Sequence, residues 1–221
     1  EKYNKEILIE EDTNNKDYDT NELNYTINES AKYKICIYGA NAERGGRGCA
    51  QCAERYFESG SIIKYQLGGK ISGGKGGEEC GATQGKGYNG AGLSKAYFSD
   101  DFYIVAGGGG GSSESHINRG GDCQQNGEGK HGGRGAIIDN GQGGNGEGND
   151  NTTGICCGGG GGNGHKGGEG GYKGLDTEDW GGGGGGGSSY CNKTKGVICL
   201  QTSINIFNHS KLEIYKKVFE E

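Results

Sequence analysis

Three uninterrupted glycine runs, at residues 107–111, 158–162 and 181–187, limit what this chain can fold into. Residues 68–187 hold 47 of the 53 glycines in the 221-residue chain, and proline is absent. Glycine loses more conformational entropy on folding than other residues, and it has no side chain whose burial could compensate. Any ordered structure in these runs must therefore be held by hydrogen bonds of the backbone.

The glycine runs predict a bundle of threefold helices. A polyproline-II-like helix has no internal hydrogen bonds, so its N–H and C=O groups can bond laterally to neighbouring glycine helices. A proline would remove one of these lateral donors. Irregular glycine loops or a flexible linker are the alternative. The core of the predicted bundle consists of Gly107, Gly108, Gly109, Gly110, Gly111, Gly158, Gly159, Gly160, Gly161, Gly162, Gly181, Gly182, Gly183, Gly184, Gly185, Gly186 and Gly187.

The two ends of the chain favour β-strands. Residues 31–38 alternate, with Tyr33, Ile35 and Ile37 on one face and mostly polar residues on the other. Further strand candidates are residues 6–10, 24–28, 61–67, 101–106, 196–200, 203–207 and 211–215. Residues 47–58 fit either a short helix or a disulfide-tied loop. No convincing amphipathic helix is present, so an all-β fold is expected.

The expected organisation is a single structural unit. Residues 1–67 and 191–221 form a β-sandwich whose two ends pair with each other, and residues 68–190 form a glycine-rich insert packed with it. The insert also carries aromatic residues that a solvated linker does not need. Among them, Trp180 is expected to pack its ring against the glycine bundle rather than on a sugar.

Nine cysteines predict a disulfide framework, and hence a secreted, extracellular or cell-surface protein. Cys191 and Cys199 form a plausible local pair, and the adjacent Cys156 and Cys157 are expected to join two different segments. An odd number leaves one thiol free, capped or intermolecular. The spacing of Cys49 and Cys52 matches half a zinc site, but no second half follows, so disulfides are favoured. The disulfide candidates are Cys36, Cys49, Cys52, Cys80, Cys123, Cys156, Cys157, Cys191 and Cys199.

Five N-x-S/T sequons point to the same compartment, since composition alone predicts about two. The predicted N-glycosylation sites are Asn24, Asn28, Asn151, Asn192 and Asn208.

Several classes of function are disfavoured. The formal net charge is −6, so a basic nucleic-acid-binding face is not expected. No apolar run approaches about 18 residues, which argues against a membrane span. The phosphate-loop-like segment 69–75 is followed by Gly76, where a metal-binding Ser or Thr would be needed. His116, His131, His165 and His209 lie in separate contexts. No catalytic residue, metal or cofactor is therefore expected, and the chain is not expected to be an enzyme.

Several phrases, in order, resemble a known family. They are Tyr25–Ala40, Tyr65–Lys70, the Gly-Tyr-Asn-Gly-Ala-Gly stretch 87–92, the stretch 104–113 that enters the first glycine run, and the late run 181–190. Together they resemble the glycine-rich domain of the anaplastic lymphoma kinase and leukocyte tyrosine kinase ectodomains, which is similar to modules in secreted protist proteins and bacteriophage tail-tip adhesins. The resemblance implies a TNF-like jelly-roll β-sandwich with an inserted polyglycine helix bundle, and it carries no catalytic residues.

We expect an extracellular structural glycoprotein that self-assembles into a fibre or coat, with copies of itself as partners. The expected contacts are exposed strand edges at both termini. The alternative is an adhesin or receptor-type ectodomain that binds a protein or glycan through loops of the glycine-rich bundle.

Overall fold

The computed structural model describes residues 5–78, 86–99, 102–113, 118–130, 132–147, 157–174 and 181–218. These residues contain eleven β-strands and no helix. The strands are β1 (Lys5–Asn14), β2 (Leu23–Thr26), β3 (Ala31–Tyr38), β4 (Cys49–Phe57), β5 (Ile62–Gln66), β6 (Ser94–Phe98), β7 (Phe102–Ala106), β8 (Tyr190–Cys191), β9 (Ile198–Cys199), β10 (Ser203–Ile204) and β11 (Ser210–Val218).

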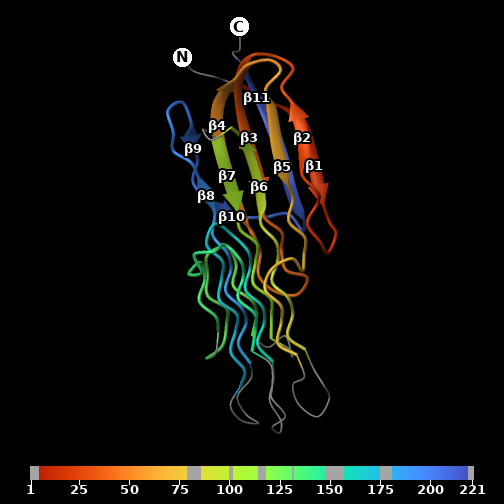
Figure 1. Cartoon of the computed structure of the whole chain (residues 1–221), viewed down its shortest axis with the longest axis vertical. Helices are drawn as coiled ribbons and strands as arrows, with labels where there is room; N and C mark the ends of the chain where they lie inside the picture. Colours follow the sequence, from red (N-terminus) through yellow and green to blue (C-terminus); the bar gives the residue numbers. More distant parts are fainter. Residues whose placement is uncertain are drawn as a thin grey trace.

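The strands form two antiparallel sheets that face each other. Sheet A has the order β1-β11-β3-β4-β10, with β9 also paired to β4, and sheet B has the order β2-β5-β6-β7-β8. The two ends of the chain pair with each other through β1 and β11, as the sequence predicted. Both termini lie at the end of the molecule away from the glycine-rich segments (Figure 1).

The core lies between the two sheets. The alternation in β3 is confirmed, because Tyr33, Ile35 and Ile37 are buried. Phe57 of β4 lies at the centre of an aromatic group and makes edge-on ring contacts with Tyr33, Phe98 and Phe102. Each such side chain contributes about 1.5–3 kcal/mol of hydrophobic stabilisation when it is fully buried.

Residues 47–58 form neither a helix nor a loop, which corrects the sequence expectation. Cys49–Phe57 is a strand that pairs with β3 along its length, with Cys36 opposite Cys52 and Ile35 opposite Ala53. The inward face carries the small residues Cys49 and Ala53, so the usual alternation of large apolar and polar residues is weak.

The expectation of free edges at both termini holds only for the N-terminal strand. The C-terminal strand β11 lies between β1 and β3 and is therefore an inner strand. The sandwich also includes β6, β7 and Tyr190 of β8, which come from within residues 68–190. The strand β7 runs directly into the first glycine run.

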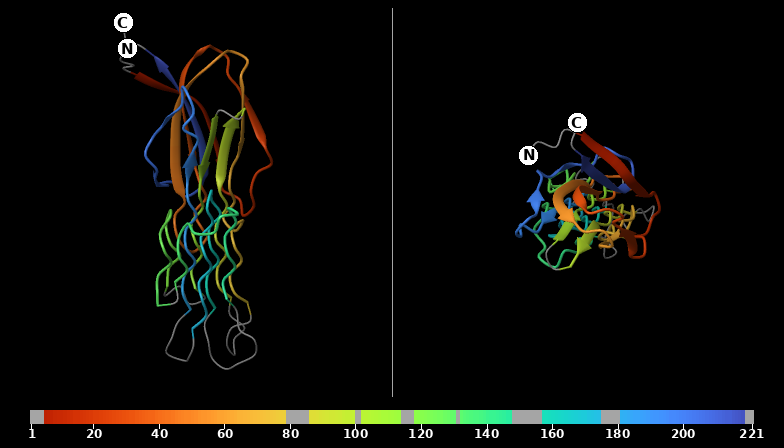
Figure 2. Two further views of the ribbon diagram at one scale, coloured as in Figure 1. Left: turned by 60° about the vertical axis from the view of Figure 1, so that its left-hand side comes forward. Right: turned by 90° about the horizontal axis from the view of Figure 1, so that it is seen from above.

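The glycine-rich segments run side by side along the long axis and extend from one end of the sandwich (Figures 1 and 2). Their backbone hydrogen bonds repeat every three residues. Within the second run, residues three apart donate to the same neighbouring segment, and successive residues donate to different segments. The donor–acceptor pairs are Gly158–Glu147 and Gly161–Gly144, Gly159–Gly182 and Gly162–Gly185, and Gly160–Tyr88 and Asn163–Ala91, at 2.8–3.0 Å.

The third run follows the same three-residue pattern. Gly182 and Gly185 donate to one segment, at Tyr172 and Glu169. Gly183 and Gly186 donate to a second segment, at Glu128 and Gln125, and Gly184 and Gly187 donate to a third, at Gly111 and Gly108. The glycine runs are thus held by backbone bonds to several neighbours at once, which a flexible linker would not show.

Close approach of the backbones explains why these positions are glycine. A Cβ atom added to Gly160 would lie 1.8 Å from the carbonyl oxygen of Gly74, and one added to Gly161 would lie 1.9 Å from that of Gly168. No side chain fits at these positions, so here the segments pack backbone against backbone, and the side chains buried elsewhere in this region include small ones such as that of Ala91.

Candidate functional surfaces

The structure pairs six of the predicted cysteines. The disulfides are Cys36–Cys52, Cys49–Cys123 and Cys191–Cys199, and the last confirms the local pair expected from the sequence. Cys157 is disulfide-bonded as well. Cys80 and Cys156 lie outside the described residues.

The Cys49-x-x-Cys52 spacing is not half a zinc site. Both cysteines form disulfides, and they have different partners. In the described ranges, no cluster of three or more His, Cys, Asp and Glu residues could hold a metal ion.

The Cys49–Cys123 disulfide ties the sandwich to the glycine-rich region. It joins the first residue of β4 to a residue 74 positions later. Next to it, the backbone N–H of Cys49 donates to the carbonyl of Gly107 at 2.7 Å, and that of Cys123 donates to the carbonyl of Arg47 at 2.8 Å. At this point the sandwich and the glycine-rich region are therefore joined both by a disulfide and by backbone hydrogen bonds.

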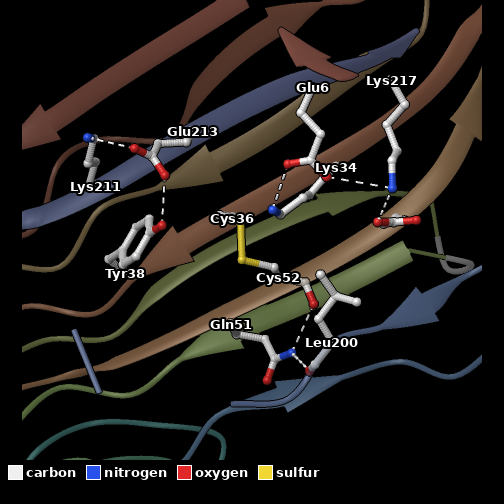
Figure 3. The surroundings of a disulfide bond; sticks show 11 residues. Glu6, Lys34, Cys36, Tyr38, Gln51, Cys52, Leu200, Lys211, Glu213 and Lys217 are labelled. Atoms are coloured by element: carbon white, nitrogen blue, oxygen red, sulfur yellow. Dashed lines mark hydrogen bonds and ion pairs between the residues drawn. A yellow bond between two sulfur atoms is a disulfide. The ribbon is translucent and has the colours of Figure 1, made fainter. Parts of the chain in front are cut away.

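The outer face of sheet A carries a network of ion pairs that holds β1 against its neighbours (Figure 3). Lys34 of β3 lies 2.8 Å from Glu6 of β1, and Lys217 of β11 contacts both Glu6 and Glu54. Lys32 lies 3.0 Å from Glu54. Burial raises the pKa of Glu54, but hydrogen bonds from Lys217 and Lys32 outweigh it, so the pKa is lowered overall.

A second group on this face surrounds Glu213. Its carboxylate accepts a hydrogen bond from Tyr38 at 2.7 Å and pairs with Lys211 at 2.7 Å. Burial opposes ionisation of Glu213, yet the bonds from Lys211 and Tyr38 leave its pKa lowered. Burial, followed by the bond to Glu213, raises the pKa of Tyr38. These contacts fasten β3 to β11.

The strand β1 gives sheet A a long free edge. It pairs with β11 on one side, and within the described residues no strand pairs with its other side. Its ten residues span about 33 Å. Ile7, Leu8 and Ile9 are 42 %, 44 % and 36 % exposed. The register shifts between Leu8 and Glu10, so a bulge interrupts the edge at Ile9.

The outer face of sheet B carries a groove lined by tyrosines, which we call the tyrosine groove. A row of opposed residues crosses the sheet, from Asn24 through Lys64, Tyr97 and Tyr103 to Asn192. The Tyr103 ring lies 6.5 Å from that of Tyr97 and 6.3 Å from that of Tyr190. His165 stacks on Tyr190 at 4.2 Å.

Two adjoining hollows form this groove. The first, of about 410 Å³, is lined by Lys95, Tyr97, Ser99, Tyr103, Tyr190 and Asn192. The second, of about 460 Å³, shares Lys95 and Tyr103 with the first and extends to residues 139–142 and 163–165 of the glycine-rich region. Among the described lining residues, Leu93 is the only large aliphatic one.

The tyrosines differ in how their hydroxyl groups are used. Tyr97 donates to Glu22, and this bond is the main cause of the raised pKa of Tyr97. Burial and the neighbouring Tyr190 raise the pKa of Tyr103. The hydroxyl groups of Tyr103 and Tyr190 make no hydrogen bond to any described residue, so their polar atoms are available at the groove.

Sequence reasoning missed this groove. The strand β6 was not predicted, although Lys95 and Tyr97 alternate with the buried Ser94 and Ala96, and this pattern could have identified it. Periodicity within one strand could not have shown that Tyr97, Tyr103 and Tyr190 meet across three strands.

The described sequon asparagines are accessible. Asn24, Asn28 and Asn208 are exposed, and Asn192 is partly exposed at the rim of the tyrosine groove. Asn151 lies outside the described residues, as do His116, His131 and Trp180. His209 stacks on Phe207. Glycosylation of the five sequons stays a prediction.

No family model matches the chain, and no curated protein matches it. In the part of the chain that the structure describes, no helix is long and apolar enough to span a membrane.

Proposed function

We propose that this protein is an extracellular structural glycoprotein that assembles with copies of itself through β1. The long free edge of this strand, with Ile7, Leu8 and Ile9 exposed on it, is the observation that carries the proposal. An exposed apolar edge strand is a template for a further strand, which would satisfy its outward N–H and C=O groups and bury its side chains.

The charges of β1 favour a second copy of the same strand as its partner. Lys5 lies at one end of the strand, and the acidic residues Glu10, Glu11 and Asp12 lie toward the other. Glu6, which follows Lys5, and Glu11 are already paired with lysines of β3 and β11. An antiparallel arrangement brings Lys5 of each copy toward the acidic end of its partner. A parallel arrangement would set like charges side by side. The bulge at Ile9 restricts the contact, which prevents uncontrolled growth along this edge.

A fibre or coat needs a second contact, because pairing between two identical edges gives a closed dimer that cannot grow further. The odd number of cysteines supplies a candidate. With nine cysteines, at least one has no partner within its own chain. An interchain disulfide would then link one pair of subunits to the next. The three described disulfides are compatible with the oxidising, extracellular environment that this requires.

The finer architecture is part of the same proposal. The three-residue period of hydrogen bonds supports threefold polyglycine helices in the glycine-rich region. Two facing antiparallel sheets with paired terminal strands support the TNF-like jelly roll that the resemblance implies. A rod with a backbone core suits a structural subunit, since its shape depends on little side-chain packing.

The alternative, an adhesin or receptor-type ectodomain, assigns binding to loops of the glycine-rich region. Residues 79–85, 148–156 and 175–180 of that region lie outside the described residues. We therefore base the proposal on the β1 edge.

Sedimentation velocity of the unreduced protein tests the proposal. The wild type is expected to sediment as twice the 23.0 kDa subunit or as larger species. Leu8→Lys places a charge on the edge without touching the core, and it should weaken association at least tenfold. Ile206→Lys changes an exposed isoleucine outside the strands and should have no effect. A wild type that is monomeric at all concentrations, or equal effects of the two variants, would overturn the proposal.

A further inference from the structure

The tyrosine groove contains its own attachment point for a sugar. Asn192, a sequon asparagine, lines the first hollow together with Tyr103 and Tyr190. Its backbone N–H donates to the carbonyl of Tyr103 at 2.9 Å, so the two residues are direct neighbours across the sheet. Side chains of directly opposed residues in an antiparallel pair lie on the same face. A glycan linked to Asn192 would start inside the groove.

The chemistry of the groove matches a pyranose. One face of a pyranose ring presents C–H groups that pack against an aromatic ring, whereas its hydroxyl groups require hydrogen-bonding partners. Tyr103 and Tyr190 supply the rings, one face of Tyr190 being covered by His165. The hydroxyl groups of both tyrosines have no bond to any described residue. Beyond them, the second hollow presents the polar side chains of Asn140 and Gln142.

A protein partner fits this surface less well. The buried centres of protein interfaces are depleted in charged residues and rich in apolar contact. Here the floor between the two hollows carries Lys95, and Leu93 is the only large aliphatic residue among the described lining. Aromatic rings set among amide and charged groups, with little aliphatic surface, favour a hydroxylated ligand.

We propose that the N-linked glycan of Asn192 folds back into the tyrosine groove, its first sugars stacked on Tyr103 and Tyr190 and its outer sugars reaching Asn140 and Gln142. This inference rests on the extracellular location in the proposed function. The glycan covers the outer face of sheet B, so this face takes no part in contacts between copies, and assembly is directed to the edge of sheet A.

Resistance to a glycosidase under native conditions tests this placement. The full chain is secreted from a eukaryotic cell line, glycopeptide mass spectrometry establishes occupancy, and release by a peptide-N-glycosidase is followed site by site without denaturant. The glycan on Asn192 should be released at least tenfold more slowly than the glycan on the exposed Asn208 of the same molecule. After denaturation the two rates should become equal.

Variants separate stacking from general folding. Tyr103→Ala removes the ring and should abolish the protection at Asn192, whereas Tyr103→Phe keeps the ring and should retain it. An unchanged melting temperature and disulfide map show that Tyr103→Ala is folded; if it is not, Tyr190→Ala provides the same test. An unoccupied Asn192, equal native release rates at the two sites, or protection unaffected by Tyr103→Ala would overturn the inference. None of these results bears on association through β1, which sedimentation measures separately.

Discussion

Cys49 at the start of β4 is bonded to Cys123 in the glycine-rich region, and this disulfide joins two parts whose stability has different origins. The sandwich is stabilised by buried side chains, among them Phe57 and Ile35. The glycine-rich region is held by backbone hydrogen bonds between segments distant in sequence.

Removal of this disulfide should be costly. The Cys49→Ala/Cys123→Ala double variant removes a link between residues 74 positions apart, and the chain-entropy model gives a loss of about 4.5 kcal/mol. The Cys191→Ala/Cys199→Ala double variant removes a link between residues only eight positions apart. Its free energy of unfolding should fall by about 2–3 kcal/mol. Chemical denaturation of both variants checks the order, and a smaller loss for the first would contradict this account of how the two parts are joined.

A single methyl group in the glycine-rich region should be poorly tolerated. Gly160→Ala places a Cβ 1.8 Å from a backbone oxygen that cannot move independently, and it should cost about 3 kcal/mol or more. Gly60 has a positive φ and open space around it, so Gly60→Asn should cost less than about 1 kcal/mol. Thermal unfolding of the two variants measures this difference. Similar melting temperatures would show that the backbone core is looser than described.

Stability should fall in acid. The pKa values of Glu54 and Glu213 are lowered in the folded protein by their lysine and tyrosine partners, which outweigh burial. Their stabilisation is therefore fully present above the ordinary carboxyl pKa of 4.5 and is lost as the pH falls through the lowered folded values. Denaturant unfolding from pH 7 to pH 3 should show this decline. Glu54→Gln should make the decline shallower, and an unchanged slope would show that Glu54 does not contribute.

The fold could be predicted where a short stretch of sequence had a clear pattern or spacing. The alternation around Ile35 identified β3, and the short spacing of Cys191 and Cys199 identified their disulfide. The strand β4 was missed because the inward Cys49 and Ala53 are small. The pairing of Cys49 with Cys123 could not be found from spacing, since nine cysteines allow many connectivities.

The candidate surfaces were predictable only in part. A terminal edge strand was expected, and β1 is one, but the position of β11 depends on long-range pairing that no local pattern contains. The tyrosine groove required three strands to be placed side by side. The proximity of Asn192 to Tyr103, 89 residues apart in sequence, is likewise a property of the sheet.

Negative-stain electron microscopy of the native, unreduced protein tests self-assembly most directly. The account predicts elongated subunits joined in pairs at the ends that carry β1, with the pairs linked into regular filaments or sheets, and it predicts that Leu8→Lys breaks the contact within each pair. Single dispersed rods at all protein concentrations would contradict the claim that this chain is a self-assembling structural subunit.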